Sequence, residues 1–436
     1  MKKRFGTMSA TLCFAMFLAA CTSGGAAGGG AAESAAGGAS ADAAEEVTIR
    51  VFNSKVEIAE PFNALISEYE SQHPGVKIEV VSQMSDSAST ALRSRFAAGQ
   101  MPDLFSVTPR DIELWADQLA DMSGEPWVGD VVDSAVEGAT VDGKLLGFPL
   151  AIEGFGYLYN KDHFEKAGIT ALPTTHAEMR EVVEKLEAAG FAPFVVPYGD
   201  WYNPGMFSSD NPFAKQPNPQ QFIASLSDGA ANIADDALFQ DWVKSVRLEI
   251  DHAAGDPLMV DYNTQVTMFA TGAGSMTTSC NCLQPMIDEI APNLNIGIMS
   301  IPINDDADMN GNILVNTAYW GVFNDSEVKE EVKEFLSWMA SDAGARYIAE
   351  EFKLVPAFRS MKVDRELIGP LGADVKAYVD ANKTVNTTTH LWPDGTPTEF
   401  GSVLQKLGAQ EIADDRVLSE FQAAWEKQRK QSGSNQ

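Results

Sequence analysis

A short aromatic segment near the middle of the chain carries side chains well suited to ligand recognition. It reads Tyr198-Gly199-Asp200-Trp201-Tyr202-Asn203-Pro204. Large aromatics are unusual in a Gly- and Pro-containing loop, where water would surround them. A pyranose has an apolar C–H face and a polar rim, so its recognition requires aromatic faces beside amide and carboxylate groups. Trp201 and Tyr202 are therefore candidate stacking residues, and the alternative is that they cap a hydrophobic core.

Hydrolysis is the competing chemistry. The chain has 61 aspartates and glutamates, enough to supply the carboxylate pair of an exported glycosidase. Against this interpretation, the sequence contains no G-x-S-x-G, no H-E-x-x-H and no phosphate-binding loop, and its five histidines form no metal-like cluster. A third class, an adhesin or structural surface protein, would bind no small ligand saturably.

Two patterns resemble metal sites, and both are incomplete. Cys280 and Cys282 would supply two ligands without a nearby histidine, too few for zinc. Cysteines two residues apart are hard to join without strain, so packed thiols are expected. The segment Asp306–Gly311 fits the first half of a calcium loop, but Thr317 occupies the twelfth position, where a bidentate glutamate is required. A hairpin turn is expected there, and no metal or cofactor is predicted.

The first hundred residues of the globular part alternate between strand and helix patterns. Val47–Phe52 and Val76–Val81 have strand patterns, and between them Phe62, Leu65, Ile66 and Tyr69 lie on one helical face. A second helix and a third strand follow, an order typical of an α/β domain with a mostly parallel sheet. Ligands of such sheets bind beyond the carboxyl ends of the strands. This rule nominates Asn53, Ser54, Gln83 and Thr108.

The N-terminus has the pattern of a secretory signal. Lys2, Lys3 and Arg4 precede an apolar stretch too short for a membrane span, followed by Leu18-Ala19-Ala20-Cys21. These four residues match the lipobox of bacterial lipoproteins, which implies cleavage after residue 20 and a lipid on Cys21. Residues 21–46 are almost wholly Gly, Ala and Ser and predict a disordered tether.

Charge and length restrict the partners and the domain number. The formal net charge is −30, from 31 lysines and arginines against 61 acids. Such a balance argues against nucleic acid or an anionic membrane face as partner. The residues that remain after the signal and tether suffice for two domains.

The stretch from Asp142 to Gly168 carries a family resemblance. It reads D-G-K-L-L-G-F-P-L-A-I-E-G-F-G-Y-L-Y-N-K-D-H-F-E-K-A-G. It resembles the "G-K-x-x-x-x-P-x-x-x-E…L-x-Y-N-K-D" signature of extracellular solute-binding proteins, family 1, the maltose-binding-protein-like sugar receptors of ATP-driven (ABC) importers. Met101–Phe105, Asp261–Met276 and Ile296–Pro302 are similar to further motifs of the family.

The resemblance implies an α/β fold of the two-lobed, periplasmic-binding-protein-like class II type. Each lobe would be a mostly parallel sheet flanked by helices, and three crossings would join the lobes. The expected crossings are the Asp142–Gly168 stretch, Ile296–Pro302 and Leu354–Pro356. Lobe 1 would comprise residues 47–153 and 301–353, and lobe 2 residues 154–300 and 354–429, followed by a disordered tail at 430–436.

The resemblance also implies a function. A monomeric lipoprotein, held on the outer face of the cell membrane, would capture a mono- or oligosaccharide between its lobes by hinge bending. It would then deliver the sugar unaltered to the membrane subunits of an ABC importer. The resemblance implies a ligand-facing turn that carries Thr278 and Ser279, and an aromatic contact from Trp392. Glu153 and Asn316 are candidates because they lie at crossings and strand ends. Trp320, with Tyr319, could face the cleft or the core. In the maltose-binding branch a tryptophan stands near position 280, where this chain has Cys280-Asn281-Cys282.

These readings combine into one hypothesis for the site. Trp201 and Trp392 would stack on sugar rings, and Glu153, Asn53 and Asn316 would exchange hydrogen bonds with hydroxyls.

Overall fold

The computed structural model describes residues 47–83, 85–361, 363–364 and 366–433. The predictions for the signal 1–20, the tether 21–46 and Cys21 lie outside the described residues. At the other end, α17 (Asp414–Gly433) continues into the segment 430–436 that was expected to be disordered, so its first four residues are helical.

The amino-terminal strands and helices follow the predicted order. β1 (Val47–Asn53), α1 (Ala59–Gln72), β2 (Val76–Ser82), α2 (Ser85–Ala97) and β3 (Leu104–Val107) alternate along the chain, and β1 pairs in parallel with both β2 and β3. The α1 helix buries Phe62, Leu65, Ile66 and Tyr69, the face that the periodicity predicted. The α/β class is therefore confirmed.

One sheet runs through both lobes. Its strand order is β2-β1-β3-β10-β6-β8-β7, with β9 and β11 also pairing with β6 and β12 with β10. β10 (Ile313–Val322) is antiparallel to β3 and β6, and β6 (Phe148–Asn160) is antiparallel to β8 (Met276–Cys280) and β9 (Ile296–Met299). The sheet is thus mixed, where each lobe was expected to be mostly parallel, because the connecting strands run against their neighbours.

The β6 strand is the passage that the Asp142–Gly168 stretch predicted. All thirteen of its residues are buried. Its first half pairs with β10, and its second half pairs with β8 and β9. A Cβ atom at Gly154 would overlap the side chain of Val375, and one at Gly156 would overlap the carbonyl of Met299. The two glycines therefore allow α15 (Gly369–Asp380) and β9 to pack directly against the strand.

The second passage lies further along the chain than predicted. β9 pairs only with the second half of β6, and Ile301 and Ile303 belong to the same hydrophobic cluster as Tyr157. The next strand, β10, pairs with β3 at one end, with β12 (Thr384–Asn386) at the other, and with β6 along most of its length. The Ile296–Pro302 stretch therefore stays within lobe 2, and β10 is the strand that crosses. β11 (Val355–Pro356) pairs with Ile152 and Ala151 of β6.

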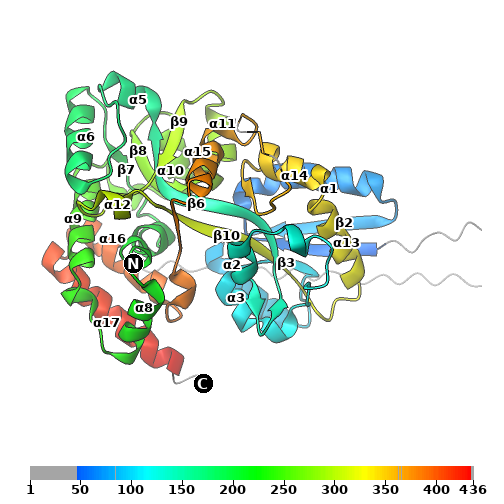
Figure 1. Ribbon diagram of the computed structural model, residues 1–436. Coiled ribbons are helices and arrows are strands. Elements are labelled where there is room, and N and C mark those ends of the chain that lie inside the picture. The colour runs from blue at the N-terminus through cyan, green and yellow to red at the C-terminus, as the bar shows by residue number, and fades with distance from the viewer. Residues whose placement is uncertain (1–46, 84, 362, 365, 434–436) are drawn as a thin grey trace, which may run out of the picture. The chain divides into compact units, whose positions relative to one another are not determined.

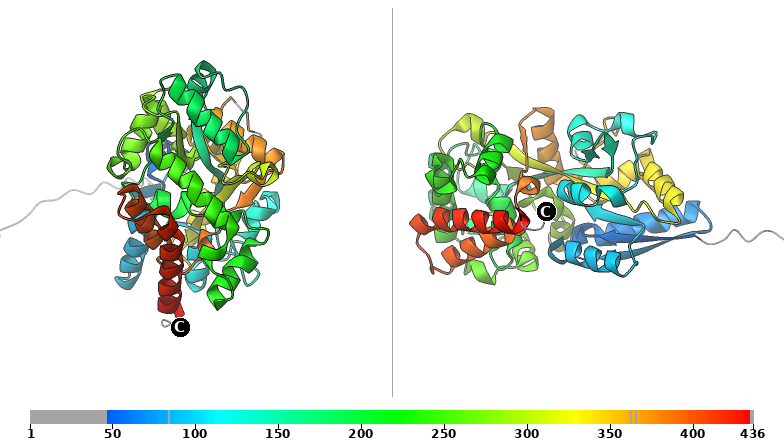
Figure 2. Two further views of the ribbon diagram at one scale, coloured as in Figure 1. Left: turned by 90° about the vertical axis from the view of Figure 1, so that its left-hand side faces the viewer. Right: turned by 90° about the horizontal axis from the view of Figure 1, so that it is seen from below.

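Two hydrophobic clusters form the interior. The first core surrounds β1, β3, β10 and α13 (Lys329–Met339), and the second core is built around α6 (His176–Ala188), α9 (Ala237–Asp251), α16 (Thr396–Gly408) and α17. Figure 1 shows these two groups of elements on either side of β6 and β10, and Figure 2 shows the same division from below. The first core also includes Phe269, Leu283 and Ile287, so the exact lobe boundaries stay a prediction.

The remaining elements complete the two lobes. Those next to the first core are α3 (Pro109–Leu114), α4 (Asp133–Glu137), β4 (Thr140–Val141), β5 (Lys144–Leu145) and α14 (Asp342–Arg346). The others are α5 (Lys161–Lys166), β7 (Phe194–Val195), α7 (Asn211–Ala214), α8 (Pro219–Asp228) and α12 (Ala307–Asn310), together with α10 (Tyr262–Ala270) and α11 (Gln284–Ile290), whose Phe269 and Ile287 belong to the first core. Asp306 caps α12 through its carboxylate, so the expected hairpin turn at Asp306–Gly311 is a short helix.

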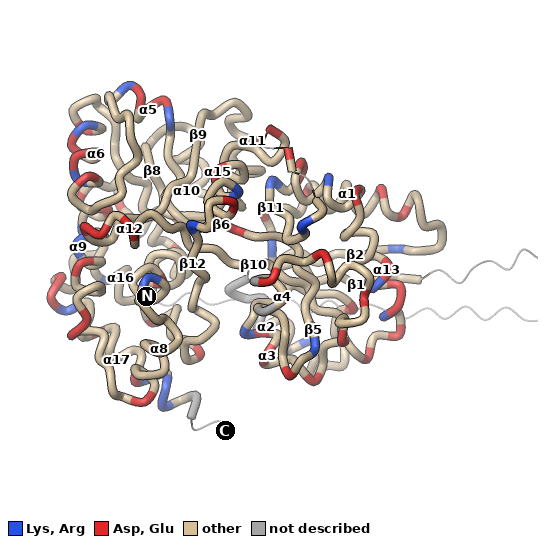
Figure 3. Tube along the Cα trace, viewed as in Figure 1, with Lys and Arg blue, Asp and Glu red and all other residues tan. Residues whose placement is uncertain are grey.

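Charged residues are spread over the outer helices. Figure 3 shows acidic positions on elements of both lobes, among them α5, α6 and α13. Among the described residues, no helix combines the length and the apolar character needed to cross a membrane.

Candidate binding cavity

A cavity of about 250 Å³ lies where β1 and β3 end. On the lobe 1 side it is lined by Ser54, Lys55, Val56, Glu57, Leu92, Ser106, Val107, Thr108 and Asp111. β6 and β10 contribute Leu150, Glu153, Phe155 and the residues 316–320. The facing wall consists of Tyr202, Met206, Phe207, Tyr262, Cys280 and Cys282. The cavity thus lies at the carboxyl ends of parallel strands, as the rule for open α/β sheets predicted.

The turn after β1 is shaped by Asn53. Its side-chain amide donates to the Lys55 carbonyl at 2.7 Å, and its side-chain oxygen accepts from the Lys55 N–H at 3.1 Å. The Ser54 N–H donates to the Ser106 hydroxyl at 3.0 Å, which ties the ends of β1 and β3 together. Asn53 is completely buried and does not line the cavity, so its role is to build the turn that presents Lys55.

An ionic network forms the polar side of the cavity. The Lys55 ammonium pairs with Glu153 of β6 and, at 3.1 Å, with Glu57 of η1 (Val56–Ile58). Burial alone would lower the pKa of Lys55, but the charges of Glu153 and Glu57 outweigh it and raise that pKa. Burial raises the pKa of Glu153, and the Lys55 ammonium opposes the rise. One cation between two carboxylates leaves oxygen lone pairs that can accept hydrogen bonds from ligand hydroxyls.

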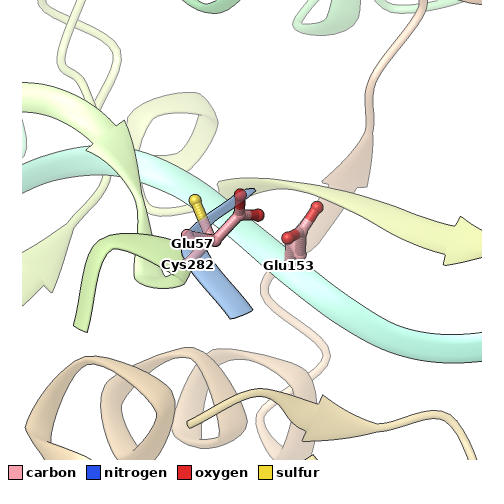
Figure 4. Close-up of side chains that lie close together, drawn as sticks. All are labelled: Glu57, Glu153 and Cys282. Atoms are coloured by element: carbon pink, nitrogen blue, oxygen red, sulfur yellow. The ribbon is translucent and has the colours of Figure 1, made fainter. Parts of the chain in front are cut away.

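Glu57, Glu153 and Cys282 come together beside this network (Figure 4). One ligand atom of each lies within 4.8 Å of the others. This set does not fit a metal ion, because both carboxylates already pair with the Lys55 ammonium and the Cys282 sulfur is bonded to Cys280. A cysteine binds a metal ion as a free thiolate, which a disulfide-bonded sulfur is not.

The disulfide between Cys280 and Cys282 corrects the expectation of packed thiols. The chain turns from β8 into η7 (Asn281–Leu283), and this turn brings the two Cα atoms to 5.1 Å, within the usual range for a disulfide. Spacing in sequence did not reveal this local geometry.

Aromatic rings form the opposite wall. Tyr202 and Phe207 have ring centroids 5.7 Å apart, Phe155 and Phe207 4.7 Å, and Tyr202 and Tyr262 5.9 Å. Tyr202 precedes the π-helical turn η4 (Asn203–Ser208), which Asn203 anchors by donating to the Thr278 carbonyl at 2.7 Å. The cavity therefore combines an aromatic wall with charged and amide groups, the pairing that the sequence analysis associated with sugar recognition.

Half of the predicted ligand residues lie at this cavity. Those that line it are Ser54, Thr108, Glu153, Tyr202, Asn316 and Trp320. Glu153 and Asn316 face each other as register partners on β6 and β10. Trp320 contributes from the core side, because it is fully buried and its ring centroid lies 5.2 Å from that of Phe62.

The other predicted residues lie away from the cavity lining, which does not contain Asn53, Gln83, Trp201, Thr278, Ser279 or Trp392. Thr278 and Ser279 are buried within β8. The Thr278 carbonyl accepts from Asn203 and Gln265 instead of facing a ligand. Gln83 follows β2, and its N–H donates to the Asn53 carbonyl.

The structure corrects the stacking role expected of Trp392. Its side chain is 1 % exposed, inside the second core. It packs 4.5 Å from Phe213, and its indole N–H donates to the Thr388 hydroxyl at 3.1 Å. Trp201 is partly exposed, but α16 packs closely against its backbone. Tyr202 is the aromatic of this loop that reaches the cavity.

Sequence reasoning missed several lining residues. Lys55 and Glu57 directly follow Asn53 and Ser54, so the strand-end rule that nominated those two could have included them. Phe207, Tyr262 and Met206 gave no such signal, because they come from helical segments whose apolar residues are indistinguishable from core residues in sequence.

Comparison with known proteins identifies the family. The profile of the bacterial extracellular solute-binding proteins matches residues 54–346. The chain belongs to this family, and the geometry above agrees with a two-lobed solute-binding-protein fold.

Curated relatives are distant but cover most of the chain. The multiple sugar-binding protein of Streptococcus mutans is 24 % identical over 310 residues, 69 % of this chain and 70 % of its own length. The melibiose/raffinose/stachyose-binding protein MelE of Bacillus subtilis is 23 % identical over 413 residues, 90 % of this chain and 92 % of its own.

Solved structures share the fold. The solute-binding protein RafE in complex with raffinose aligns with a TM-score of 0.76 at 20 % identity, covering 88 % of this chain and 100 % of its own. A sugar transporter of Bacillus licheniformis in complex with stachyose aligns with a TM-score of 0.74 at 19 % identity. The alignment covers 87 % of this chain and 100 % of the other.

Proposed function

We propose that this chain is a carbohydrate-binding protein that captures a neutral sugar in the cavity and delivers it to an ABC importer. The observation that carries the proposal is the pairing of the Tyr202–Phe207–Tyr262 aromatic wall with the Lys55–Glu57–Glu153 network across one cavity. The aromatic faces suit the C–H face of a pyranose, and the carboxylates and Asn316 suit its hydroxyls. The sugars named for MelE and for the RafE complex support this ligand class.

Capture is proposed to work by closure of the two lobes. The cavity is lined by residues from both sides of β6 and β10, so a bound sugar would contact both lobes at once. A ligand that makes more contacts in the closed arrangement shifts the open–closed balance toward it. The importer would then recognise the closed form.

The anchoring and assembly of the protein are part of the same proposal. The Leu-Ala-Ala-Cys sequence supports lipidation of Cys21, and the tether 21–46 would let a monomer approach the importer from the membrane surface. Extracellular placement follows from the family, and the lipid is testable by mass spectrometry of the mature N-terminus.

An exported glycosidase is the alternative to weigh, because Glu57 and Glu153 have carboxylate oxygens within 4.8 Å of each other. A glycosidase requires one carboxyl group to be a proton donor and the other free to attack or activate water. The Lys55 ammonium pairs with both groups here, so neither carboxylate is free to attack or to activate water. We propose that the chain performs no chemistry on its ligand.

A calorimetric and thermal-shift screen tests the proposal. Neutral sugars should bind saturably and raise the unfolding temperature, and chromatography should recover each sugar unchanged. Tyr202→Ala should weaken binding more than tenfold, on the scale of a lost buried aromatic contact. Trp201→Ala is the matched control and should change affinity less than threefold. Product formation, or the absence of saturable binding, would contradict the proposal.

A further inference from the structure

We propose that the Cys280–Cys282 disulfide is a reducible part of the binding cavity, so that a small dithiol weakens sugar capture and a bound sugar protects the disulfide. This inference rests on the proposed function and adds a site of covalent modification to it. Both cysteines line the cavity, and both are otherwise buried. A reductant must therefore reach the disulfide through the space that the sugar would occupy.

The disulfide lies between the two walls of the cavity. Cys280 of β8 is the register partner of Phe155 on β6, whose ring packs against the aromatic wall. The Cys282 sulfur lies within 4.8 Å of a carboxylate oxygen of Glu57 and of Glu153 (Figure 4). One cross-link thus connects the side that would stack on a sugar with the side that would form hydrogen bonds to its hydroxyls.

The disulfide also restrains the residue between its two cysteines. The Asn281 side chain accepts from the Gly154 N–H and donates to the Lys353 carbonyl. The cross-link holds the Cα atoms on either side of Asn281 at 5.1 Å, which limits the backbone positions that this residue can take. Reduction removes that limit and lets the two sulfurs separate. It therefore changes both the lining of the cavity and the anchor of the strand that carries Glu153.

Reduction should alter the cavity without unfolding the protein. The stabilisation that a disulfide provides grows with the length of the loop it closes, and these cysteines are only two positions apart. Other contacts hold the same turn. Leu283 is completely buried, and the Gln284 side chain accepts from the Leu371 N–H at 3.2 Å. The effect of reduction is therefore expected on ligand affinity more than on global stability.

The exchange transfers two electrons from the dithiol to the chain. A thiolate of the dithiol attacks one sulfur of the pair, forms a mixed disulfide and expels the other sulfur as a thiolate, which takes a proton. The second thiol of the dithiol then resolves the mixed disulfide, and the reductant leaves as a cyclic disulfide. Cys280 and Cys282 end as two thiols. The described residues contain no other cysteine, so oxidation within them re-forms the same pair.

The coupling between sugar and disulfide is reciprocal. Disulfides persist in oxidising extracellular surroundings, which is where the family functions, so the cross-linked form is the resting one. If reduction weakens sugar binding by a given factor, saturating sugar disfavours reduction by the same factor. For this two-electron couple, a tenfold difference in affinity corresponds to a reduction potential about 30 mV more negative in the sugar-bound protein.

Calorimetry with glucose, maltose, melibiose and raffinose tests the inference. The mature protein carries Cys21→Ala, which keeps the anchor cysteine out of the thiol chemistry. Dithiothreitol should weaken the tightest-binding sugar of the panel about tenfold, and reoxidation should restore its affinity. Iodoacetamide trapping with mass spectrometry gives the reduced fraction across dithiothreitol ratios, with and without that sugar. Circular dichroism checks that the reduced protein stays folded.

The double variant Cys280→Ala, Cys282→Ala is the matched control for other effects of the reductant. It should bind at least as weakly as the reduced parent, and dithiothreitol should not change its affinity. A dithiothreitol effect that persists in this variant would overturn the inference.

The remaining outcomes separate the inference from the proposed function. Equal sugar affinity of the cross-linked and reduced forms, with both thiols trapped, would overturn the inference and leave sugar binding intact. A disulfide that saturating sugar does not protect, or free thiols in protein never exposed to a reductant, would do the same. Failure of every sugar to bind in either form would overturn the proposed function and the inference together.

Discussion

The side-chain oxygen of Asn281 accepts a 2.8 Å hydrogen bond from the main-chain N–H of Gly154. Asn281 is completely buried between the disulfide-bonded Cys280 and Cys282, and its amide also donates to the Lys353 carbonyl at 3.4 Å. Gly154 lies near the middle of β6, and Lys353 comes just before β11. One side chain therefore joins the turn after β8 to two segments that pass between the lobes.

Asn281→Ala should lower the free energy of unfolding by about 1–3 kcal/mol, because it leaves the buried Gly154 N–H without a partner. Urea denaturation measures the change, and Asn293→Ala, an exposed amide, is the control. Two variants with the same midpoint would show that the Gly154 contact contributes nothing. Ligand affinity should fall as well, since the bond fixes the strand that carries Glu153.

Lys55→Met should destabilise the protein by about 3 kcal/mol, because it leaves Glu57 and Glu153 close together without the cation between them. Adding Glu153→Gln to Lys55→Met should recover part of the loss. A double-mutant cycle measured by urea denaturation gives the coupling. Additive effects of the two changes would argue that the ion pair is not energetically significant.

The pH dependence of stability should report the carboxyl group of Asp210. This group is buried and accepts hydrogen bonds from the hydroxyl and the N–H of Thr388, and burial raises its pKa to about 7 despite those bonds. An acid with a raised pKa in the folded state binds more protons there than in the unfolded chain. Its contribution to stability is therefore present at low pH and is lost as pH rises from about 4 to about 7.

Asp210→Asn removes this titration. The variant should therefore gain stability relative to the parent protein as pH rises through that window, because only the parent loses the Asp210 contribution. Glu249, whose pKa burial also raises to about 7, contributes a loss of the same sign, so Glu249→Gln is a useful comparison. Parallel pH profiles for the parent and the Asp210→Asn protein would contradict the assignment.

Arg110→Ala should favour the open arrangement of the lobes. Arg110, on α3, donates to the Trp392 carbonyl at 2.5 Å and the His390 carbonyl at 3.3 Å and pairs with Asp394 at 2.7 Å, so it links lobe 1 to the loop before α16. Asp394 is largely exposed, and the ion pair itself is worth little; the two carbonyl contacts matter more. Sugar affinity should drop about threefold to tenfold, and small-angle scattering of the ligand-free protein should show a larger radius of gyration.

Arg416→Ala is the control for Arg110→Ala. Its ion pair with Glu420 stays within α17, so neither affinity nor radius should change. An Arg110→Ala protein that matches this control would show that the contact does not influence closure.

Most of the fold could be predicted from local pattern. The alternation of β1, α1, β2, α2 and β3 followed from hydrophobic periodicity, and the passage through β6 followed from the Asp142–Gly168 motif. The second passage was placed too early, because the alternation in Ile296–Pro302 indicates a strand without showing which lobe the strand belongs to. Only pairing partners distinguish a strand that stays in one lobe from a strand that crosses.

The candidate site likewise contains residues that the sequence predicts and residues that only the structure reveals. Ser54, Thr108, Glu153 and Asn316 follow strand ends or motifs, so sequence position alone brings them near the cavity. Sequence could not decide between Tyr202 and Trp201 or expose the burial of Trp392, because an aromatic residue in a polar loop has the same signature whether it faces ligand or core.

The amino-acid sequence by itself determined the α/β class, the family, the acidic charge and the strand ends that bear the polar groups, because these depend on residues close together in the chain. The tertiary structure decided which aromatic rings face the Lys55–Glu57–Glu153 network and that Cys280 and Cys282 are joined. Each of these depends on the packing of segments distant in sequence, where the direction of a side chain is set by its neighbours in space.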